Sequence, residues 1–341
     1  MTTNPGYYDF HVHVGEVIAG TQLRDDFRDL NKLTQREPSE ENPPLAGMGV
    51  FVTESPSEPL AHKLYAMQSH ARRDFSGLVQ WHLTPTQSSI EEVYPLLKAG
   101  HDLKFYTTYR QAGLYRSYAE IERWMLDLQD LKTRILVHCE DDDTITEYSA
   151  QHPFRHPHDH CLRRPEIAEI RAVEKVLDLA IKHRHPVHIV HVSTQGSAIL
   201  IREARLHFAG ITCETAPHYL LSNEHRLNSP NAHRLICTPP FRSESSRGML
   251  VELLQDGVFD ILASDHCPFH DVDKDRFKND LEHIPTGNPG VATLYSSIYQ
   301  NLVKTGKLSL EALKSMTMTN PQRLMTATSG RSPETPEHPG N

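Results

Sequence analysis

Eight short apolar segments alternate with segments of helix-like spacing, and this alternation limits the fold more than any other feature of the sequence. The apolar segments are rich in Val, Ile, Leu and aromatic residues, which is typical of buried strands. We predict strands over Tyr7–His13, Gly49–Thr53, Gly77–Leu83, Leu103–Tyr106, Arg134–Cys139, Val187–Val192, Ile211–Glu214 and Val258–Ala263. We predict helices over Glu58–Phe75, Tyr118–Leu131, Glu166–His183, Gln195–Phe208 and Glu244–Gln255.

Eight strands alternating with helices over 341 residues fit a (β/α)8 TIM barrel of the α/β class. A doubly wound open sheet is the alternative, because alternation alone does not prove that the sheet closes. No glycine-rich phosphate loop follows any predicted strand to favour that alternative. We expect one barrel domain over residues 1–325 and a disordered tail over residues 326–341, where Pro, Ser and Thr are frequent.

Composition excludes several classes of function. The net charge of −9 argues against a general binder of nucleic acids or anionic membranes. The sequence shows neither a signal peptide nor an apolar run long enough to span a membrane. Its five cysteines are scattered, odd in number and never spaced as C-x-x-C. They therefore predict reduced thiols in a cytoplasmic protein. We separately expect small molecules as its partners.

Two histidines end the first predicted strand in "DFHVH", one residue apart. Side chains at positions i and i+2 of a strand point the same way, so both imidazoles would face one site. Because the chain has 23 histidines, the pair alone decides nothing. Barrel enzymes place their chemistry at the carboxyl ends of the strands, and other strand ends here also carry candidate ligands. The predicted set is His11, His13, Lys104, His138, His191 and Asp265.

Each member of this set also has a purely structural interpretation. Lys104 could be a surface amine, the histidines could be buried and satisfied, and Asp265 could cap a turn. His188 and His191 are three residues apart, so on a strand only one of them would face the site. The set nevertheless has a coherent chemistry. Imidazoles and a carboxylate hold zinc, and an uncharged lysine can react with carbon dioxide to give a carbamate that bridges two metals. Such a pair acidifies water and polarises a carbonyl.

The motifs that contain these residues resemble those of the cyclic amidohydrolases, which include dihydroorotases, hydantoinases (dihydropyrimidinases) and allantoinases. The resemblance covers residues 7 to about 325 and rests on "DFHVHVGE", "LKFYTTY", "LVHCED", "HIVHVST", "TCETAPHYL", "CTPPFR", "ASDHCPF" and "IPTGNPGV". It implies that His11, His13 and Asp265 hold one Zn²⁺. It implies that His138 and His191 hold a second, bridged to the first by carboxylated Lys104. The implied reaction opens a cyclic amide, imide or ureide ring by attack of a metal-bridging hydroxide, with Asp265 carrying the proton.

Several positions favour the hydantoinase branch. Tyr109 stands five residues after the bridging lysine, where that branch uses a tyrosine to stabilise the oxyanion, although a rim aromatic would look the same. Thr238 stands where that branch uses a serine near the substrate's imide. Thr286 departs from the pattern of that branch, which usually has an asparagine at this position.

The carboxylate readers of dihydroorotases are missing. Their positions hold Gly15, Ser57 and Phe269, and the phenylalanine suggests an apolar wall against a neutral ring. Four other side chains could take a substrate acid group instead, namely Arg110, Arg155, Arg242 and His270.

Three further expectations concern an accessory domain, the histidine-rich run and the oligomeric state. The chain starts at its first strand and stops soon after its last helix, so we expect no accessory β-sandwich domain. The run "QHPFRHPHDHC", residues 151–161, predicts a solvated loop over the barrel mouth in preference to a second metal site. A homodimer or homotetramer is the habit of the family. Dihydroorotase or allantoinase activity stays open, as does an inactive dihydroorotase-like subunit with a structural role.

Overall fold

The fold is described by a computed structural model over residues 6–18 and 20–326. Eight strands form one sheet in the order β1-β4-β5-β6-β7-β8-β9-β10, and each strand pairs in parallel with its neighbour. Their bounds are β1 (Tyr7–Val12), β4 (Leu45–Thr53), β5 (Leu78–Thr84), β6 (Asp102–Tyr106), β7 (Ile135–His138), β8 (Val187–Ile189), β9 (Ile211–Thr215) and β10 (Ile261–Leu262). A short hairpin of β2 (Val17–Ile18) and β3 (Thr21–Gln22) follows β1.

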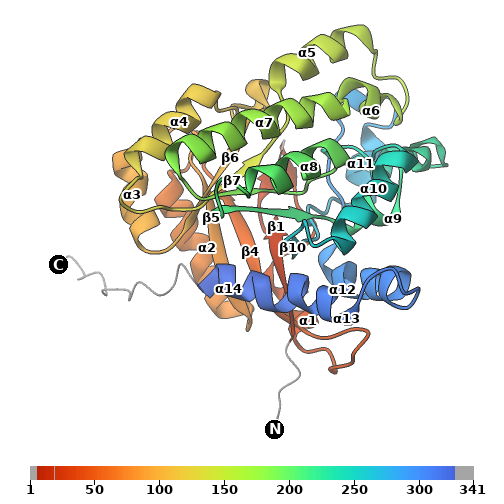
Figure 1. Ribbon diagram of the computed structural model, residues 1–341, viewed down its shortest axis with the longest axis horizontal. Coiled ribbons are helices and arrows are strands. Elements are labelled where there is room, and N and C mark those ends of the chain that lie inside the picture. Colours follow the sequence, from red (N-terminus) through yellow and green to blue (C-terminus); the bar gives the residue numbers. More distant parts are fainter. Residues whose placement is uncertain (1–5, 19, 327–341) are drawn as a thin grey trace.

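Hydrogen bonds between β1 and the segment after β10 close this sheet into a barrel. The backbone N–H of His13 donates to the carbonyl of His266 at 2.7 Å, and the N–H of His266 donates to the carbonyl of His11 at 3.1 Å. A parallel bridge also joins Val12 to His266. The predicted TIM barrel is therefore confirmed, and the open doubly wound sheet is excluded (Figure 1).

Helices surround the barrel and cover the outer face of the sheet (Figure 1). The α-helices are α1 (Phe27–Thr34), α2 (Leu60–Asp74), α3 (Ile90–Lys98), α4 (Tyr118–Asp127), α5 (Asp142–Gln151), α6 (Asp159–Arg163), α7 (Glu166–His183), α8 (Gln195–Ala204), α9 (Pro217–Leu221), α10 (Glu244–Gln255), α11 (Asp271–Arg276), α12 (Leu294–Ile298), α13 (Leu310–Lys314) and α14 (Asn320–Thr326). Short 3₁₀ or π segments are η1 (Arg110–Ala112), η2 (Glu224–Asn228), η3 (Ala232–Leu235), η4 (Leu281–His283), η5 (Val291–Thr293), η6 (Tyr299–Val303) and η7 (Ser315–Thr319).

The end signals in the sequence place two of the predicted helices correctly. Helix α7 begins after Pro165 with Glu166 in its first turn, and it ends where Arg184 adopts φ of 46°. Helix α10 also has its predicted bounds. Helix α4 ends at Asp127, four residues earlier than predicted, and its first turn is closed by a capping box between Ser117 and Glu120.

Strand β4 begins at Leu45, four residues before its predicted start. It continues through Gly47 and Gly49, which do not interrupt it. A Cβ atom at Gly49 would lie 2.4 Å from the Phe10 carbonyl and 2.3 Å from Nε2 of His82. Only glycine allows this close approach between neighbouring strands. Gly49, where the predicted strand began, is therefore required by packing inside the longer strand.

The core has two main parts. The larger cluster fills the space between the outer face of the sheet and the helices. A smaller cluster fills the barrel interior below the strand ends, and its members are Phe10, Phe51, Leu136, Val190, Ile261, Ala263 and Met325. These side chains fill the barrel interior, so a site can form only at the end of the barrel where the strands have their carboxyl ends.

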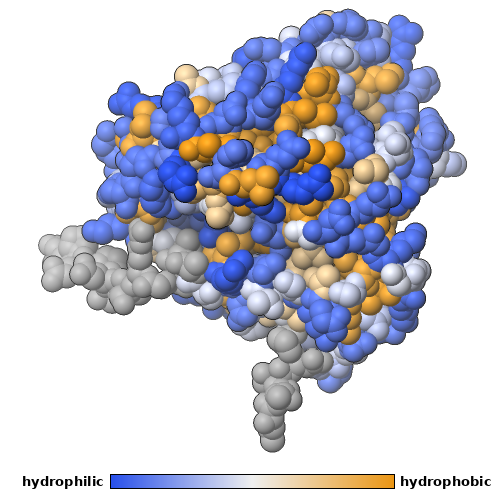
Figure 2. Space-filling view, in the orientation of Figure 1, coloured by the Kyte–Doolittle hydropathy of each residue, from blue (hydrophilic) through white to orange (hydrophobic). Residues whose placement is uncertain are grey.

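The surface, the cysteines and the carboxyl-terminal tail add four observations. Figure 2 shows a mainly hydrophilic face, with hydrophobic residues visible between the covering helices. Within residues 6–18 and 20–326, none of the helices combines the length and the apolar character needed to cross a bilayer. All five cysteines are buried and unpaired, as predicted. The predicted tail lies outside the described residues except for Thr326, which ends α14.

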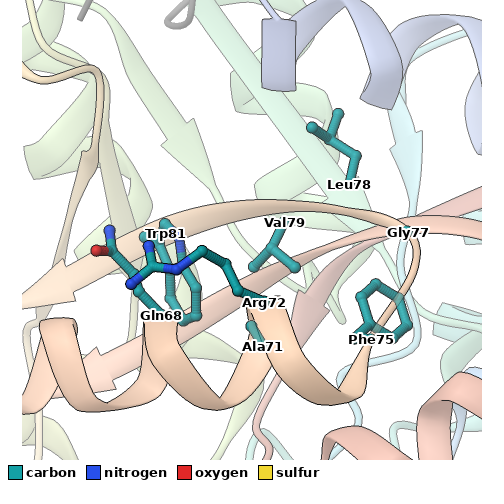
Figure 3. A pocket seen from close by; sticks show the side chains of 8 residues that line it. All are labelled: Gln68, Ala71, Arg72, Phe75, Gly77, Leu78, Val79 and Trp81. Carbon is teal, nitrogen blue, oxygen red and sulfur yellow. The ribbon is translucent and has the colours of Figure 1, made fainter. Parts of the chain in front are cut away.

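A pocket of about 300 Å³ lies between the last turns of α2 and the first residues of β5 (Figure 3). Its lining includes Arg72, Phe75, Leu78 and Trp81. The pocket lies beside the amino end of β5, whereas the predicted ligands lie at the carboxyl ends of their strands. It is therefore not part of the candidate site.

Candidate active site

Three predicted ligands meet at the carboxyl ends of the strands. One ligand atom each from His11, His191 and Asp265 lies within 4.8 Å of the other two. Nε2 of His11 is 3.2 Å from Oδ1 of Asp265. These residues come from the ends of β1, β8 and β10, so closure of the barrel brings them together.

The other predicted ligands lie around this group. The His138 ring is 4.5 Å from the His191 ring, and the His13 ring is 5.6 Å from the His11 ring, measured between centroids. Lys104 is 1% exposed, and its Nζ lies about 5 Å from the rings of Phe51 and Tyr106 without any hydrogen-bond partner. The six predicted side chains thus converge on one region.

Burial controls the protonation of this region. It lowers the pKa of His11 to about 3 and that of His138 to about 4, and it lowers the pKa of His191 well below its usual value. Burial also lowers the pKa of the Lys104 amine to about 7. The imidazoles are therefore neutral, and a large fraction of the amine is uncharged near neutral pH.

Two buried glutamates hold the outer nitrogens of the histidines. Oε1 of Glu214 lies 2.5 Å from Nδ1 of His11, and Oε2 of Glu140 lies 2.8 Å from Nε2 of His138. Glu140 also accepts a hydrogen bond of 2.7 Å from Arg164. Metal-binding histidines usually have such a carboxylate on the nitrogen that does not bind the metal.

The donor set fits a pair of zinc ions. With their outer nitrogens held by carboxylates, Nε2 of His11 and Nδ1 of His138 are left to bind metal. Lys104 supplies a buried amine without a partner, which is the group that carbamate formation requires. Sequence reasoning missed Glu140, Glu214 and Arg164. The signal for the two glutamates was a charged residue directly after or within an apolar strand, in "LVHCED" and "TCETAP". Arg164 lies outside both motifs, just before α7.

Backbone strain marks three of the predicted site residues. His191, Asp265 and Tyr109 have φ values of 37°, 53° and 66°, in the left-handed region that residues with a Cβ seldom adopt. Such strained conformations concentrate at functional sites, where the surrounding structure holds them.

The left-handed backbone at His191 also changes the expected directions of His188 and His191. On a continuous strand the two side chains would face opposite ways. Strand β8 ends at Ile189, so the extended geometry does not continue to His191. Nε2 of His188 lies 3.2 Å from Oε2 of Glu214, and the N–H of His191 donates to Oε1 of the same carboxylate at 3.3 Å. His188 therefore lies inside the barrel beneath the cluster and supports Glu214.

Tyr109 and Thr238 lie beside the ligand cluster. The Tyr109 ring is 5.3 Å from the His138 ring, and the Arg164 guanidinium is 5.1 Å from the Tyr109 ring centroid. Burial raises the pKa of the Tyr109 phenol, while Arg164 and a hydrogen bond from Thr238 oppose the rise. The net shift is upward, so the phenol keeps its proton at neutral pH and can donate it.

The other two predicted substrate contacts are Thr286 and Phe269. Thr286 is half-buried beside Gly287, whose N–H donates to the Ile236 carbonyl at 3.1 Å. Phe269 is buried in an apolar cluster with Leu23 and Cys267.

The other two positions at which dihydroorotases bind the substrate carboxylate are exposed to solvent in this chain. Gly15 is exposed with φ of 67°, and Ser57 is exposed with its hydroxyl 3.3 Å from that of Ser55.

The four side chains that could bind a substrate acid group differ in how free they are to do so. Arg242 is 4% exposed and bonds Ser193, Glu169 and the Arg164 carbonyl, so its guanidinium is fully engaged in structure. Arg110 pairs with aspartates of α5, whereas Arg155 and His270 are exposed.

The histidine-rich run 151–161 differs from the predicted solvated loop. Its His160 and Cys161 are buried, and α6 begins at Asp159, near the end of the run. The cluster of His11, His191 and Asp265 is the one group of metal-ligating geometry found among the described residues, and it does not include this run.

Comparison with known proteins identifies the family. A D-hydantoinase from Ralstonia pickettii is 30% identical over 340 residues, which is 94% of this chain and 70% of that protein. The chain belongs to the cyclic amidohydrolase family. A dihydroorotase from Brevibacillus brevis is 28% identical over 242 residues (68% of this chain), and a D-phenylhydantoinase from Escherichia coli is 28% identical over 278 residues (78% of this chain).

Solved structures of cyclic amidohydrolases share the fold. A D-hydantoinase structure superimposes with a TM-score of 0.85 at 26% identity, covering 94% of this chain and 70% of that one. A dihydropyrimidinase from Brevibacillus agri gives the same TM-score and coverage at 24% identity. No protein-family model matches the sequence. This chain spans 56% of the length of the dihydroorotase and 59% of the D-phenylhydantoinase.

Proposed function

We propose that this chain is a zinc-dependent hydrolase that opens the ring of a cyclic amide, imide or ureide. One observation carries the proposal: four histidines, an aspartate and an unpartnered buried lysine converge at the open end of the barrel. The family relationship to hydantoinases and dihydroorotases supports the same reaction class.

The proposed assignment gives His11, His13 and Asp265 to one zinc and His138 and His191 to the other. Lys104, carboxylated at Nζ, would bridge the two ions. When bound, such a pair acidifies a water molecule and polarises the carbonyl that the water attacks.

The other steps belong to side chains of this chain. Tyr109 donates a hydrogen bond from its phenol to the carbonyl oxygen as negative charge develops there, a contact typically worth a few kcal/mol in the transition state. Asp265 takes the proton released by the attacking water and delivers it to the ring nitrogen as the carbon–nitrogen bond breaks. Thr238 and Thr286 contact the polar edge of the ring.

The proposed substrate is a neutral five- or six-membered ring of the hydantoin or dihydropyrimidine type. The positions that would read a carboxylate hold Gly15, Ser57 and Phe269, and the buried Arg242 is engaged elsewhere. Phe269 is buried with Leu23 and Cys267, which agrees with an apolar wall. Dihydroorotase and allantoinase activities are the alternatives within the same chemistry.

The experiment is metal analysis of the purified protein followed by a hydrolysis panel of hydantoins, dihydrouracil, cyclic imides, allantoin and dihydroorotate. We expect two equivalents of zinc and turnover of at least one neutral ring. An inactive subunit with a structural role would carry far less metal and cleave none of the panel, and that result would refute the proposal.

Three properties beyond the reaction remain predictions. We propose a homodimer or homotetramer, a cytoplasmic location, and a single barrel domain over residues 1–325. Light scattering coupled to size-exclusion chromatography measures the first, and cell fractionation measures the second. Limited proteolysis that leaves one resistant fragment ending near residue 325 would support the third.

A further inference from the structure

We infer that His160 is a positioning residue, which fixes the direction in which the Thr238 hydroxyl donates its hydrogen bond. His160 belongs to the histidine-rich run, which the proposed reaction does not otherwise use. The inference rests on the proposed function for its consequence, because Thr238 is proposed to contact substrate. The hydrogen bonds of His160 themselves do not depend on the proposed function.

The geometry assigns the proton on His160. Its Nε2 lies 3.0 Å from the carbonyl oxygen of Cys237 and 3.1 Å from Oγ1 of Thr238. A carbonyl oxygen can only accept, so Nε2 must carry a hydrogen. Burial lowers the pKa of His160 to about 3, with the Arg164 charge acting in the same direction, so the ring is neutral at working pH. A single tautomer, with hydrogen on Nε2, satisfies both contacts.

This tautomer constrains the threonine. Because Oγ1 of Thr238 faces an N–H, it accepts from His160 and must send its own hydrogen elsewhere. The Thr238 hydroxyl lowers the pKa of the Tyr109 phenol, and we take that phenol as the acceptor of its hydrogen. If the phenol oxygen accepts from Thr238, its own hydrogen is left for a substrate carbonyl. The inferred chain of donors runs from His160 through Thr238 to Tyr109.

Packing holds His160 in this position. Its ring stacks on Phe154 with centroids 5.5 Å apart and planes at 17°. Phe154 packs in turn against the cluster of Ile236, Leu281 and Ile284, which flanks both the Thr238 loop and the Thr286 loop. The run 151–161 is thereby fastened to the two loops that carry the proposed substrate contacts.

The test is a double-mutant cycle in the zinc-loaded enzyme with the best ring substrate of the panel. We expect His160→Leu to lower kcat/KM about 10-fold, the size of one neutral hydrogen bond. His160→Gln, which keeps an N–H donor, should recover activity to within about 3-fold of the wild type. Thr238→Val should lose as much as His160→Leu, and the double variant should lose no more than Thr238→Val alone.

The matched control is His156→Leu, an exposed histidine in the same run, which should keep full activity and two zinc equivalents. Additive losses in the cycle, or a Gln variant as impaired as the Leu variant, would show that His160 acts through packing alone. Full activity of His160→Leu would overturn the inference directly.

Nitrogen NMR of the His160 ring separates this inference from the proposed function. The zinc-loaded protein should show the Nε2–H tautomer at pH 7 with or without substrate. The Nδ1–H tautomer would overturn the inference whatever the activity. The Nε2–H tautomer in a protein that cleaves no ring would instead refute the proposed function and leave the hydrogen-bond chain standing.

Discussion

Oε1 of Glu214 lies 2.5 Å from Nδ1 of His11, although 203 residues separate the two in the sequence. Both side chains are buried, at 0% and 1% exposure. Burial alone would raise the pKa of Glu214, but the neighbouring histidines His11 and His188 outweigh it and keep the carboxylate charged. The negative charge fixes the imidazole with hydrogen on Nδ1, so Nε2 faces the candidate metal centre.

Glu214→Gln should therefore weaken metal binding without removing any proposed ligand. The amide can still accept from His11, but it carries no charge to make the imidazole a better donor. Loss of such a supporting carboxylate typically costs about 10- to 100-fold in metal affinity. Competition with a chromophoric zinc chelator measures this change. Glu252→Gln, an exposed glutamate on α10, is the control and should bind zinc like the wild type.

Lys104→Ala should lose both metal equivalents, because the variant cannot form the bridging carbamate. In the wild type, reconstitution of metal-free protein should improve when bicarbonate is added, and short carboxylic acids should restore part of the activity of the variant. Metal analysis before and after reconstitution provides the measurement. A variant that keeps two zincs and full turnover would rule out the bridged centre.

A second buried lysine supplies the control for that variant. Nζ of Lys274 donates to the carbonyls of Arg234, Ile236 and Gly287 and has no proposed role in metal binding. Lys274→Met should leave these acceptors unpaired and lower the free energy of unfolding by about 2–3 kcal/mol. Its zinc content should stay at two equivalents.

Glu54 should make stability depend on pH in the acid range. Burial alone would raise its pKa, but hydrogen bonds from the Ser88 hydroxyl and from the N–H groups of Gln87, Ser88 and Thr86 outweigh it and lower the pKa from 4.5 to about 2. The folded pKa is depressed, so the stabilisation is complete above about pH 4.5 and is lost as the pH falls toward 2.

Urea denaturation between pH 3 and pH 6 tests this dependence. The wild type should exceed Glu54→Gln in free energy of unfolding by about 2 kcal/mol near pH 6, and by less at pH 3. Glu37→Gln, at an exposed glutamate, should differ little from the wild type at either pH. A gap between wild type and Glu54→Gln that does not shrink on acidification would contradict the assignment.

The barrel was predictable because its signal is repeated. Eight apolar runs separated by helical spacing leave few folds, and errors of a few residues at each end do not change the topology. The end of β8 shows where this reasoning stops. The apolar run continues to Val192, yet the strand ends at Ile189, because the left-handed turn at His191 is imposed by contacts from other strands.

The candidate ligands were predictable for a related reason. Each except Lys104 stands at or near the end of a predicted strand, and barrel topology brings strand ends together. Lys104 lies inside its predicted strand, Leu103–Tyr106. Their supporting residues could not be predicted, since Glu214 and His160 act through partners more than 70 residues away. A buried glutamate within an apolar strand was a signal for the first. Nothing in the run 151–161 distinguished His160 from its neighbours.

The last prediction concerns the substrates that the site discriminates against. Binding dihydroorotate requires desolvation of its carboxylate, which is costly unless a cation or several donors receive it. Arg242 is engaged by Ser193, Glu169 and a backbone carbonyl, and Phe269 is buried among apolar side chains. Loss of one charged contact costs about 2–3 kcal/mol, or some 30- to 150-fold in affinity.

We therefore expect kcat/KM for hydantoin or dihydrouracil to exceed that for dihydroorotate by at least about 30-fold at one pH. The sharpest comparison adds Arg155→Gln and His270→Gln, because both of these side chains are exposed and could meet a substrate acid group. If dihydroorotate is preferred and one of these variants abolishes the preference, that residue replaces the missing carboxylate readers. If neither variant changes a preference for neutral rings, the selectivity comes from the absence of an anion site.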